Sequence, residues 1–251
     1  TSDSDTGNYG SIGTCRGFKR GWNCQVVKGE SDMNVEKSLE QLETLITQHR
    51  TNEIEGFLLE KIEDSASQED IGSLITLMNE LIGYYRESGE FEKALGYCRE
   101  VLQVAAQAGL AGTIPYATTL LNVANTCREG GLVREAMVHY QEVRGIYINN
   151  IEDTDFRYVN LYNGMGMLFQ DMGDYESACD CQERALSVAV LYHEARAETA
   201  ILYTSLAIYQ IKLMRYQEAI ENLRRAFELF EEDEKKDYHY SMVQRVEIGK
   251  Q

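Results

Sequence analysis

The sequence predicts an all-α fold, an α-solenoid of stacked helical hairpins. Apolar residues recur at helical spacing from about residue 34 onward, and the 251 residues include a single proline. Small residues also recur with a period of 41–42 residues. One hairpin of two helices cannot bury its apolar side alone, so recurring hairpins are expected to stack on one another.

The first 31 residues differ in composition from the rest of the chain. They are rich in Gly, Ser, Thr and Asn, show no helical apolar period, and contain the only tryptophan, Trp22. Their four basic and three acidic side chains give a net charge of +1, whereas the remaining residues carry 20 basic and 38 acidic side chains. We therefore expect a tail or small loop-rich appendage over residues 1–31, followed by one repeat domain over residues 32–251.

Two helices are expected before the first repeat and one after the last. Residues 34–66 carry two successive apolar stripes, and residues 238–248 follow a charged break. Terminal repeats of a solenoid need a polar outer face. We therefore expect residues 34–66 to form the N-terminal cap and residues 238–248 to form the C-terminal helix.

Small residues at equivalent positions mark four repeats between these caps. Alanines recur at spacings of 42, 42 and 41 residues, and turn glycines at 42 and 42. A small residue lets the second helix of a hairpin approach the first, and a glycine suits the turn between them. The alanines are Ala94, Ala136, Ala178 and Ala219, and the glycines are Gly89, Gly131 and Gly173. The predicted repeats are residues 75–108, 117–150, 159–192 and 200–233. The only proline, Pro115, lies just before the second repeat, where it suits a first helical turn.

These positions resemble tetratricopeptide repeats. The residues that carry the resemblance are Leu81, Tyr85, Gly89, Phe91 and Ala94; Val123, Ala124, Gly131 and Ala136; Met165, Gly166, Phe169, Gly173, Tyr175 and Ala178; and Leu206, Ala207, Tyr216 and Ala219. The period exceeds the usual length of about 34 residues and is similar to that of the kinesin light chain-like subgroup. The resemblance implies a right-handed superhelix. Met214 replaces the turn glycine of the last repeat, which we expect to be less regular.

The resemblance also implies a ligand site on the concave face, lined by the first helix of each repeat. Carried over position by position, the expected peptide-binding residues are Asn79, Arg86, Leu121, Asn125, Arg128, Asn163, Met167, Gln170, Thr204, Ile208, Ile211 and Lys212. The asparagines would pair with the backbone of an extended peptide, because one amide both donates and accepts hydrogen bonds. Repeats that bind the carboxylate tails of chaperones use lysines where this chain has neutral residues, so such a ligand is not expected.

Enzymatic, metal-binding and nucleic-acid-binding functions find little support in the sequence. The four histidines form no pair spaced for a metal on a helix, and Cys179 and Cys181, two residues apart, do not face each other. Cys98, Cys127 and Cys179 are predicted to be small buried residues. The formal net charge of −17 repels phosphate backbones and anionic lipids. We predict a non-enzymatic, cytoplasmic scaffold without cofactor or metal that binds a protein or peptide, with a cationic ligand favoured, and neither nucleic acid nor membrane.

Two alternative functions remain open. Bacterial peptide-sensing regulators have a similar repeat architecture, and an adaptor subunit of an enzyme complex could use the same surface. Residues 34–66 provide only two acidic helices, which disfavours a DNA-binding version of such a regulator.

The basic-aromatic stretch within the tail has two interpretations. It is either a disordered tail or a cationic segment, native or fused, that docks in cis on the acidic repeat domain. The residues of this possible cis ligand are Cys15, Arg16, Phe18, Lys19, Arg20, Trp22 and Cys24. The two cysteines lie nine residues apart and could close a disulfide loop, but they would stay reduced in the cytosol.

Overall fold

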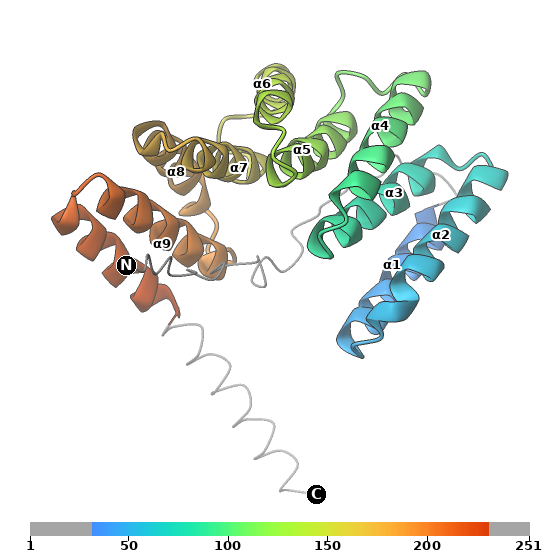
Figure 1. Ribbon diagram of the computed structural model, residues 1–251, viewed down its shortest axis with the longest axis horizontal. Helices are drawn as coiled ribbons and strands as arrows, with labels where there is room; N and C mark the ends of the chain where they lie inside the picture. Colours follow the sequence, from blue (N-terminus) through green and yellow to red (C-terminus); the bar gives the residue numbers. More distant parts are fainter. Residues whose placement is uncertain (1–31, 231–251) are drawn as a thin grey trace, which may run out of the picture.

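The computed structural model describes residues 32–230, and this part of the chain folds into helices joined by short turns (Figure 1). The predicted all-α solenoid is confirmed. The tail over residues 1–31 and the predicted helix over residues 238–248 lie outside the described residues. The helices are α1 (Asp32–Thr47), α2 (Thr51–Ser67), α3 (Ile71–Glu87), α4 (Phe91–Gln107), α5 (Ile114–Glu129), α6 (Val133–Asn150), α7 (Arg157–Asp171), α8 (Tyr175–Ala189) and α9 (Arg196–Lys212), followed by a helix over residues 216–230, here called the last described helix.

Successive hairpins follow one another along an arc. In the middle of the arc, α5 lies on the inner side and α6 on the outer side (Figure 1). The first helices α1, α3 and α5 each contact the second helix of their own hairpin and the first helix of the next hairpin, as α3 does with α4 and α5. This arrangement gives every internal hairpin a neighbour on both sides, which is how a solenoid buries its apolar surface.

The aligned alanines lie where the two helices of each hairpin meet. Ala94, Ala136 and Ala178 are fully buried, and Ala219 is almost so. The third repeat packs closely at Gly166 as well, because a Cβ atom there would lie 3.0 Å from Gln182 Oε1 and 3.5 Å from the Ala178 carbonyl oxygen. The small residues that revealed the repeat in the sequence therefore set the distance between helices.

Seven helices end in the same hydrogen-bonded turn. After α3, for example, Gly89 has a φ of +77°, its N–H donates to the Arg86 carbonyl, and the next N–H donates to the Tyr85 carbonyl. This is the Schellman motif, in which a residue with positive φ allows two otherwise unpaired carbonyls to accept hydrogen bonds. In these seven turns the residues with positive φ are His49, Glu69, Gly89, Gly109, Gly131, Gly173 and Met214.

The expectation of a less regular last repeat is wrong at this turn. Met214 has a φ of +60°, and the turn makes the same two hydrogen bonds as the others, to the carbonyls of Ile211 and Gln210. The Met214 side chain is 75% exposed, so it meets no steric barrier from neighbouring helices. The backbone hydrogen bonds therefore hold a conformation that a non-glycine residue rarely adopts.

The second repeat begins as its proline predicts. Thr113 precedes α5 and its hydroxyl accepts a hydrogen bond from the Tyr116 N–H at 3.4 Å, while Pro115 lies in the first turn. Proline suits this position because the first N–H groups of a helix have no partner within the helix.

Candidate protein-binding surface

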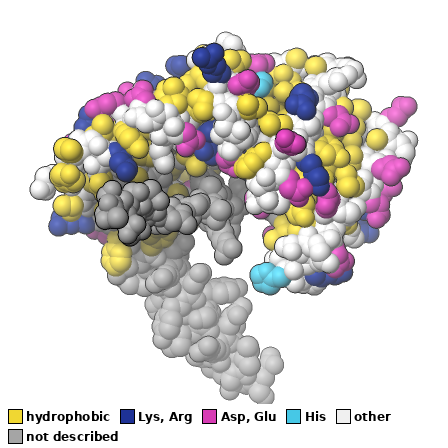
Figure 2. Space-filling view, viewed as in Figure 1, with side chains coloured by type: hydrophobic (Ala, Val, Ile, Leu, Met, Phe, Trp, Pro, Cys, Tyr) yellow, Lys and Arg dark blue, Asp and Glu magenta, His cyan; other side chains and the backbone are white. Residues whose placement is uncertain are grey.

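The predicted ligand residues all lie on the first helices of the four repeats. Asn79 and Arg86 are on α3, and Thr204, Ile208, Ile211 and Lys212 are on α9. Leu121, Asn125 and Arg128 are on α5, and Asn163, Met167 and Gln170 are on α7. These twelve residues are called the inner face below. The space-filling view shows that the molecule is an arch, hollow on the inner side of the arc (Figure 2).

Asn79 connects the first two repeats. Its Nδ2 donates to the Thr119 hydroxyl at 3.0 Å, and its Oδ1 accepts from Asn122 Nδ2 at 3.0 Å. Thr119 and Asn122 are both buried on α5. The amide of Asn79 is thus occupied by contacts between hairpins, through two polar residues that the sequence analysis did not identify.

Asn125 has a similar role within the second repeat. Its Oδ1 accepts a hydrogen bond of 2.6 Å from the hydroxyl of Tyr140, which is fully buried on α6. Burial raises the pKa of Tyr140, so the hydroxyl remains protonated and acts as the donor. Gly164 of α7 packs on this pair, since a Cβ atom there would lie 2.8 Å from Tyr140 Cε1. The Asn125 oxygen therefore supports the contact between the second and third repeats.

Asn163 takes part in a third contact between helices. Gln182, fully buried on α8, donates from Nε2 to Asn163 Oδ1 and to the Leu202 carbonyl of α9, both at 3.3 Å. Tyr140 and Gln182 each lie four residues after an aligned alanine, at a position where the first repeat has the apolar Cys98. Polar residues at this otherwise apolar position were the available signal that the inner asparagines have partners within the fold.

The two inner-face arginines pair with carboxylates of the following repeat. Arg86 Nε lies 3.4 Å from Glu129 Oε2, and Arg128 Nη1 lies 2.9 Å from Asp171 Oδ2. Arg128 also pairs with Glu129 at 2.8 Å, and only 8% of its side chain is exposed. Both arginines are thus neutralised by the protein itself, which leaves little positive charge to attract an anionic ligand.

The inner face is more open toward its C-terminal end. Gln170, Ile208, Ile211 and Lys212 are exposed and Met167 is half-buried, whereas Leu121 is buried. The Thr204 hydroxyl donates to the Ala200 carbonyl of its own helix at 2.9 Å. Exposed isoleucines on two successive turns of α9 provide apolar surface that a ligand side chain can cover.

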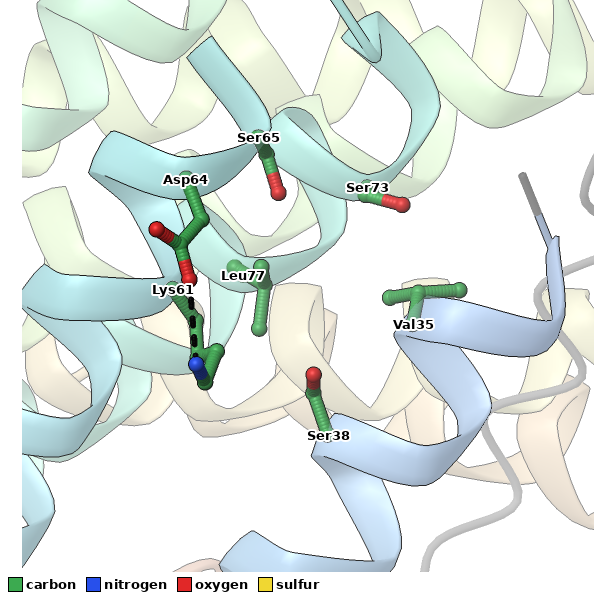
Figure 3. Close-up of a pocket in the computed structure, with 7 residues that line it drawn as sticks. All are labelled: Val35, Ser38, Lys61, Asp64, Ser65, Ser73 and Leu77. Carbon is green, nitrogen blue, oxygen red and sulfur yellow. Dashed lines mark hydrogen bonds and ion pairs between the residues drawn. The ribbon is translucent and has the colours of Figure 1, made fainter. Parts of the chain in front are cut away.

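A small pocket lies at the other end of the molecule, between α1, α2 and α3 (Figure 3). It is lined by Val35, Ser38, Lys61, Asp64, Ser65, Ser73 and Leu77, and Lys61 Nζ lies 3.0 Å from Asp64 Oδ2. Its volume of about 10 Å³ corresponds to a single water molecule. The pocket is therefore too small for a substrate or cofactor.

The cysteines of the described helices are buried, as predicted for Cys98, Cys127 and Cys179. Burial raises the pKa of Cys98 to about 12 and the pKa values of Cys179 and Cys181 to about 11. Such thiols stay protonated near neutral pH and behave as small apolar side chains rather than nucleophiles. The possible cis ligand, including Cys15 and Cys24, lies outside the described residues.

Metal ligands and membrane spans were also sought within residues 32–230. No group of three or more His, Cys, Asp or Glu side chains there could hold a metal ion. Over the same range, no helix combines the length and apolar character that crossing a membrane requires.

Comparison with known proteins gives one family and several similar folds. The family profile described as tetratricopeptide repeat matches residues 73–149 and 157–232. No curated protein sequence matches this chain. The crystal structure of BtubC (BKLC) from P. vanneervenii is 20% identical with a TM-score of 0.69, over 81% of this chain and 84% of that one.

Two further solved structures have a similar fold at lower identity. A putative kinesin light chain from Podosopora anserina, with nearly identical TPR-like repeats, is 15% identical with a TM-score of 0.63, over 82% of this chain and 99% of that one. MamA is 13% identical with a TM-score of 0.52, over 77% and 96% of the two chains. These likenesses concern the fold alone.

Proposed function

Because this chain belongs to the tetratricopeptide repeat family, whose stacked hairpins present extended concave surfaces for binding, we propose that it is a non-enzymatic scaffold that binds a segment of another protein on its inner face. The observation that carries this proposal is the open apolar surface of α9. Ile208 and Ile211 are 45% and 43% exposed on the helix that lines the C-terminal part of the inner face.

The proposed ligand contacts lie mainly on α7 and α9. Met167, Ile208 and Ile211 would cover apolar ligand side chains, and Gln170 would hydrogen-bond to the ligand backbone. Asn79, Asn125 and Arg128, which already have partners within the fold, would shape this surface rather than supply most of its binding energy. The binding site is thus concentrated in the last two repeats.

The charge distribution favours a ligand with basic residues. Glu87 ends α3, and the whole chain has a formal net charge of −17, whereas Glu129 and Asp171, which end α5 and α7, already pair with arginines. A carboxylate at the C-terminal end of a helix is unfavourable with respect to the helix dipole, so a ligand cation near Glu87 would be stabilised. Electrostatic attraction of this kind would also accelerate association at low ionic strength.

The test begins with a pull-down from the native host and continues with calorimetry on the identified partner. Ile208→Glu combined with Ile211→Glu is expected to weaken binding at least about tenfold, which corresponds to roughly 1.4 kcal/mol, without lowering the melting temperature. The matched control is Val138→Glu, because Val138 is at least as accessible on α6, at the outer side of the arc. Unchanged affinity in the α9 variant, or an equal loss in the control, would contradict an inner-face site.

The same material distinguishes a scaffold from a peptide-sensing regulator. A sensor changes its overall shape on binding, so the radius of gyration measured by small-angle X-ray scattering would shift when the ligand is added. For a scaffold we expect the radius of gyration of the repeat domain to remain constant.

A further inference from the structure

The two central repeats expose apolar side chains at the same position of their second helices. Ile148 of α6 is 60% exposed, and Val190 and Leu191, directly after α8, are 47% and 55% exposed. Ile148 and Val190 each lie twelve residues after an aligned alanine. The second helix of the first repeat, α4 over residues 91–107, exposes no large apolar side chain. This surface is therefore a property of the middle of the array.

The same two helices carry opposite charges at another shared position. Glu142 of α6 and Arg184 of α8 each lie six residues after an aligned alanine, and both side chains are exposed. Within residues 32–230, neither side chain forms an ion pair. Arg184 Cζ lies 5.8 Å from the centroid of the Tyr162 ring, which positions the guanidinium without neutralising its charge. Both charges are therefore available to another molecule.

Small residues lie between the charged and the apolar positions. Gly145 of α6 and Ser187 of α8 each lie nine residues after an aligned alanine, and both are exposed. A Cβ atom on Gly145 would have no atom within 4 Å. Another helix can approach closely where the residues at the contact are small.

The charged and apolar positions match one another when a second copy of the chain is rotated. Consecutive second helices of a solenoid run in the same direction, because each repeat has the same orientation as the one before it. A rotation by 180° about an axis that lies between α6 and α8 and runs along them places α6 of each copy against α8 of the other. Glu142 then faces Arg184 of the other copy, and Ile148 faces Val190. Each contact occurs twice, as in any isologous interface.

We propose that two copies of this chain pair through the exposed faces of α6 and α8, with the Glu142 carboxylate of each copy against the Arg184 guanidinium of the other. A second copy fits this surface better than a uniformly acidic or basic partner, because the surface carries both charges at equivalent positions. The arc curves away from α6 on both sides (Figure 1), so the contact is confined to the central repeats. Such a small interface gives a dimer that dissociates on dilution. The pairing does not depend on ligand binding at the inner face.

Sedimentation velocity of the full chain over a range of protein concentrations tests the pairing. We expect a monomer–dimer equilibrium. Glu142→Arg and Arg184→Glu each place like charges opposite each other twice, so each should raise the dissociation constant at least about tenfold. The double variant restores opposite charges and should return the dissociation constant to within about threefold of that of the unmodified chain.

Glu63→Arg is the matched control for net charge, because Glu63 is exposed on α2, away from the proposed contact. It should leave the dissociation constant unchanged. Ile148→Asp removes the apolar contact and should raise the dissociation constant at least about tenfold. Circular dichroism verifies that each variant keeps its helices. Equal effects of Glu63→Arg and Glu142→Arg would overturn the proposal, since net charge alone would then control association.

One shared position does not match. Val138 and Asp180 each lie two residues after an aligned alanine, and both are exposed, so an apolar side chain would face a carboxylate. Asp180→Val should therefore lower the dissociation constant about three- to tenfold. A weaker dimer in this variant would contradict the proposed register.

Three further results would overturn the pairing. The first is a monomer at every concentration, and the second is a dimer that the Glu142→Arg, Arg184→Glu double variant fails to restore. The third is a monomeric chain that binds a different protein, identified by pull-down, and loses it through Ile148→Asp. That result would assign the exposed faces of α6 and α8 to another partner.

Discussion

Helices α3 and α5 differ from α9 and the last described helix in how they use their polar and apolar side chains. On α3 and α5, Asn79, Asn125 and Arg128 pair with neighbouring helices. Large apolar side chains of α9 and the last described helix remain exposed, at Ile208, Ile211, Tyr216, Ile220, Leu223, Phe227 and Phe230. Repeats of one family therefore differ in their packing, since the N-terminal pairs hold hairpins together whereas large apolar side chains at the C-terminal end stay exposed.

The largest effect is expected from overpacking the contact between helices, and it should be greater inside the array than at its end. Ala136 and Ala178 are fully buried where two helices meet. Replacing either with Trp forces a large ring into that contact, which should lower the free energy of unfolding by roughly 1–3 kcal/mol or more. Ala219→Trp should destabilise less, because the described chain offers neighbours on only one side of the last hairpin. Melting temperatures of the three variants and of the exposed control Val138→Trp measure this. Equal melting temperatures for all four would refute the repeat alignment.

Two glycines of the first helices should respond to the same substitution with opposite signs. Gly164→Ala places a Cβ atom 2.8 Å from Tyr140 Cε1 and should destabilise the protein by about 1–3 kcal/mol. Gly83→Ala meets no atom within 4 Å and should stabilise α3 by about 0.5–1 kcal/mol, since alanine favours helices. Urea unfolding gives both free energies. Destabilisation of both variants would mean that α3 is as closely packed there as α7.

Substitution of an inner-face polar residue that has a hydrogen-bond partner within the fold should lower the free energy of unfolding. Substitution of an exposed one should not. Asn125→Ala removes the acceptor of the buried Tyr140 hydroxyl and should lower the free energy of unfolding by about 1–3 kcal/mol. Gln170→Ala, on the exposed surface of α7, should change it by less than about 0.5 kcal/mol. Urea unfolding curves of the two variants provide the comparison. A stable Asn125→Ala variant would show that its amide is free for a ligand.

The smallest effect concerns the turn after α9. Met214→Gly should stabilise the last repeat by about 1 kcal/mol, because glycine adopts the positive φ of 60° without the steric cost that methionine incurs there. Met172→Gly, at the residue directly after α7 where φ is −80°, should give no such gain. Calorimetric melting temperatures would distinguish the two. A lower melting temperature for Met214→Gly would imply that the methionine side chain makes a stabilising contact.

The sequence by itself determined the fold because a repeated pattern reports directly on packing. The aligned alanines suit a close contact between helices, the positive-φ glycines suit a turn, and Pro115 suits the first turn of a helix. Such requirements recur in every copy, so their period is visible without any knowledge of the structure. The same logic predicted the buried cysteines, which lie beside core positions of their helices.

Only the tertiary structure decided which inner-face residues form hydrogen bonds or ion pairs with neighbouring helices. Asn79 and Asn122 are 43 residues apart, as are Arg128 and Asp171, and each pair forms across two hairpins. Helical periodicity assigns a side chain to a face but does not specify which atoms of the next hairpin it meets. The turn at Met214 was decided in the same way, since its two backbone hydrogen bonds outweigh the local preference against positive φ.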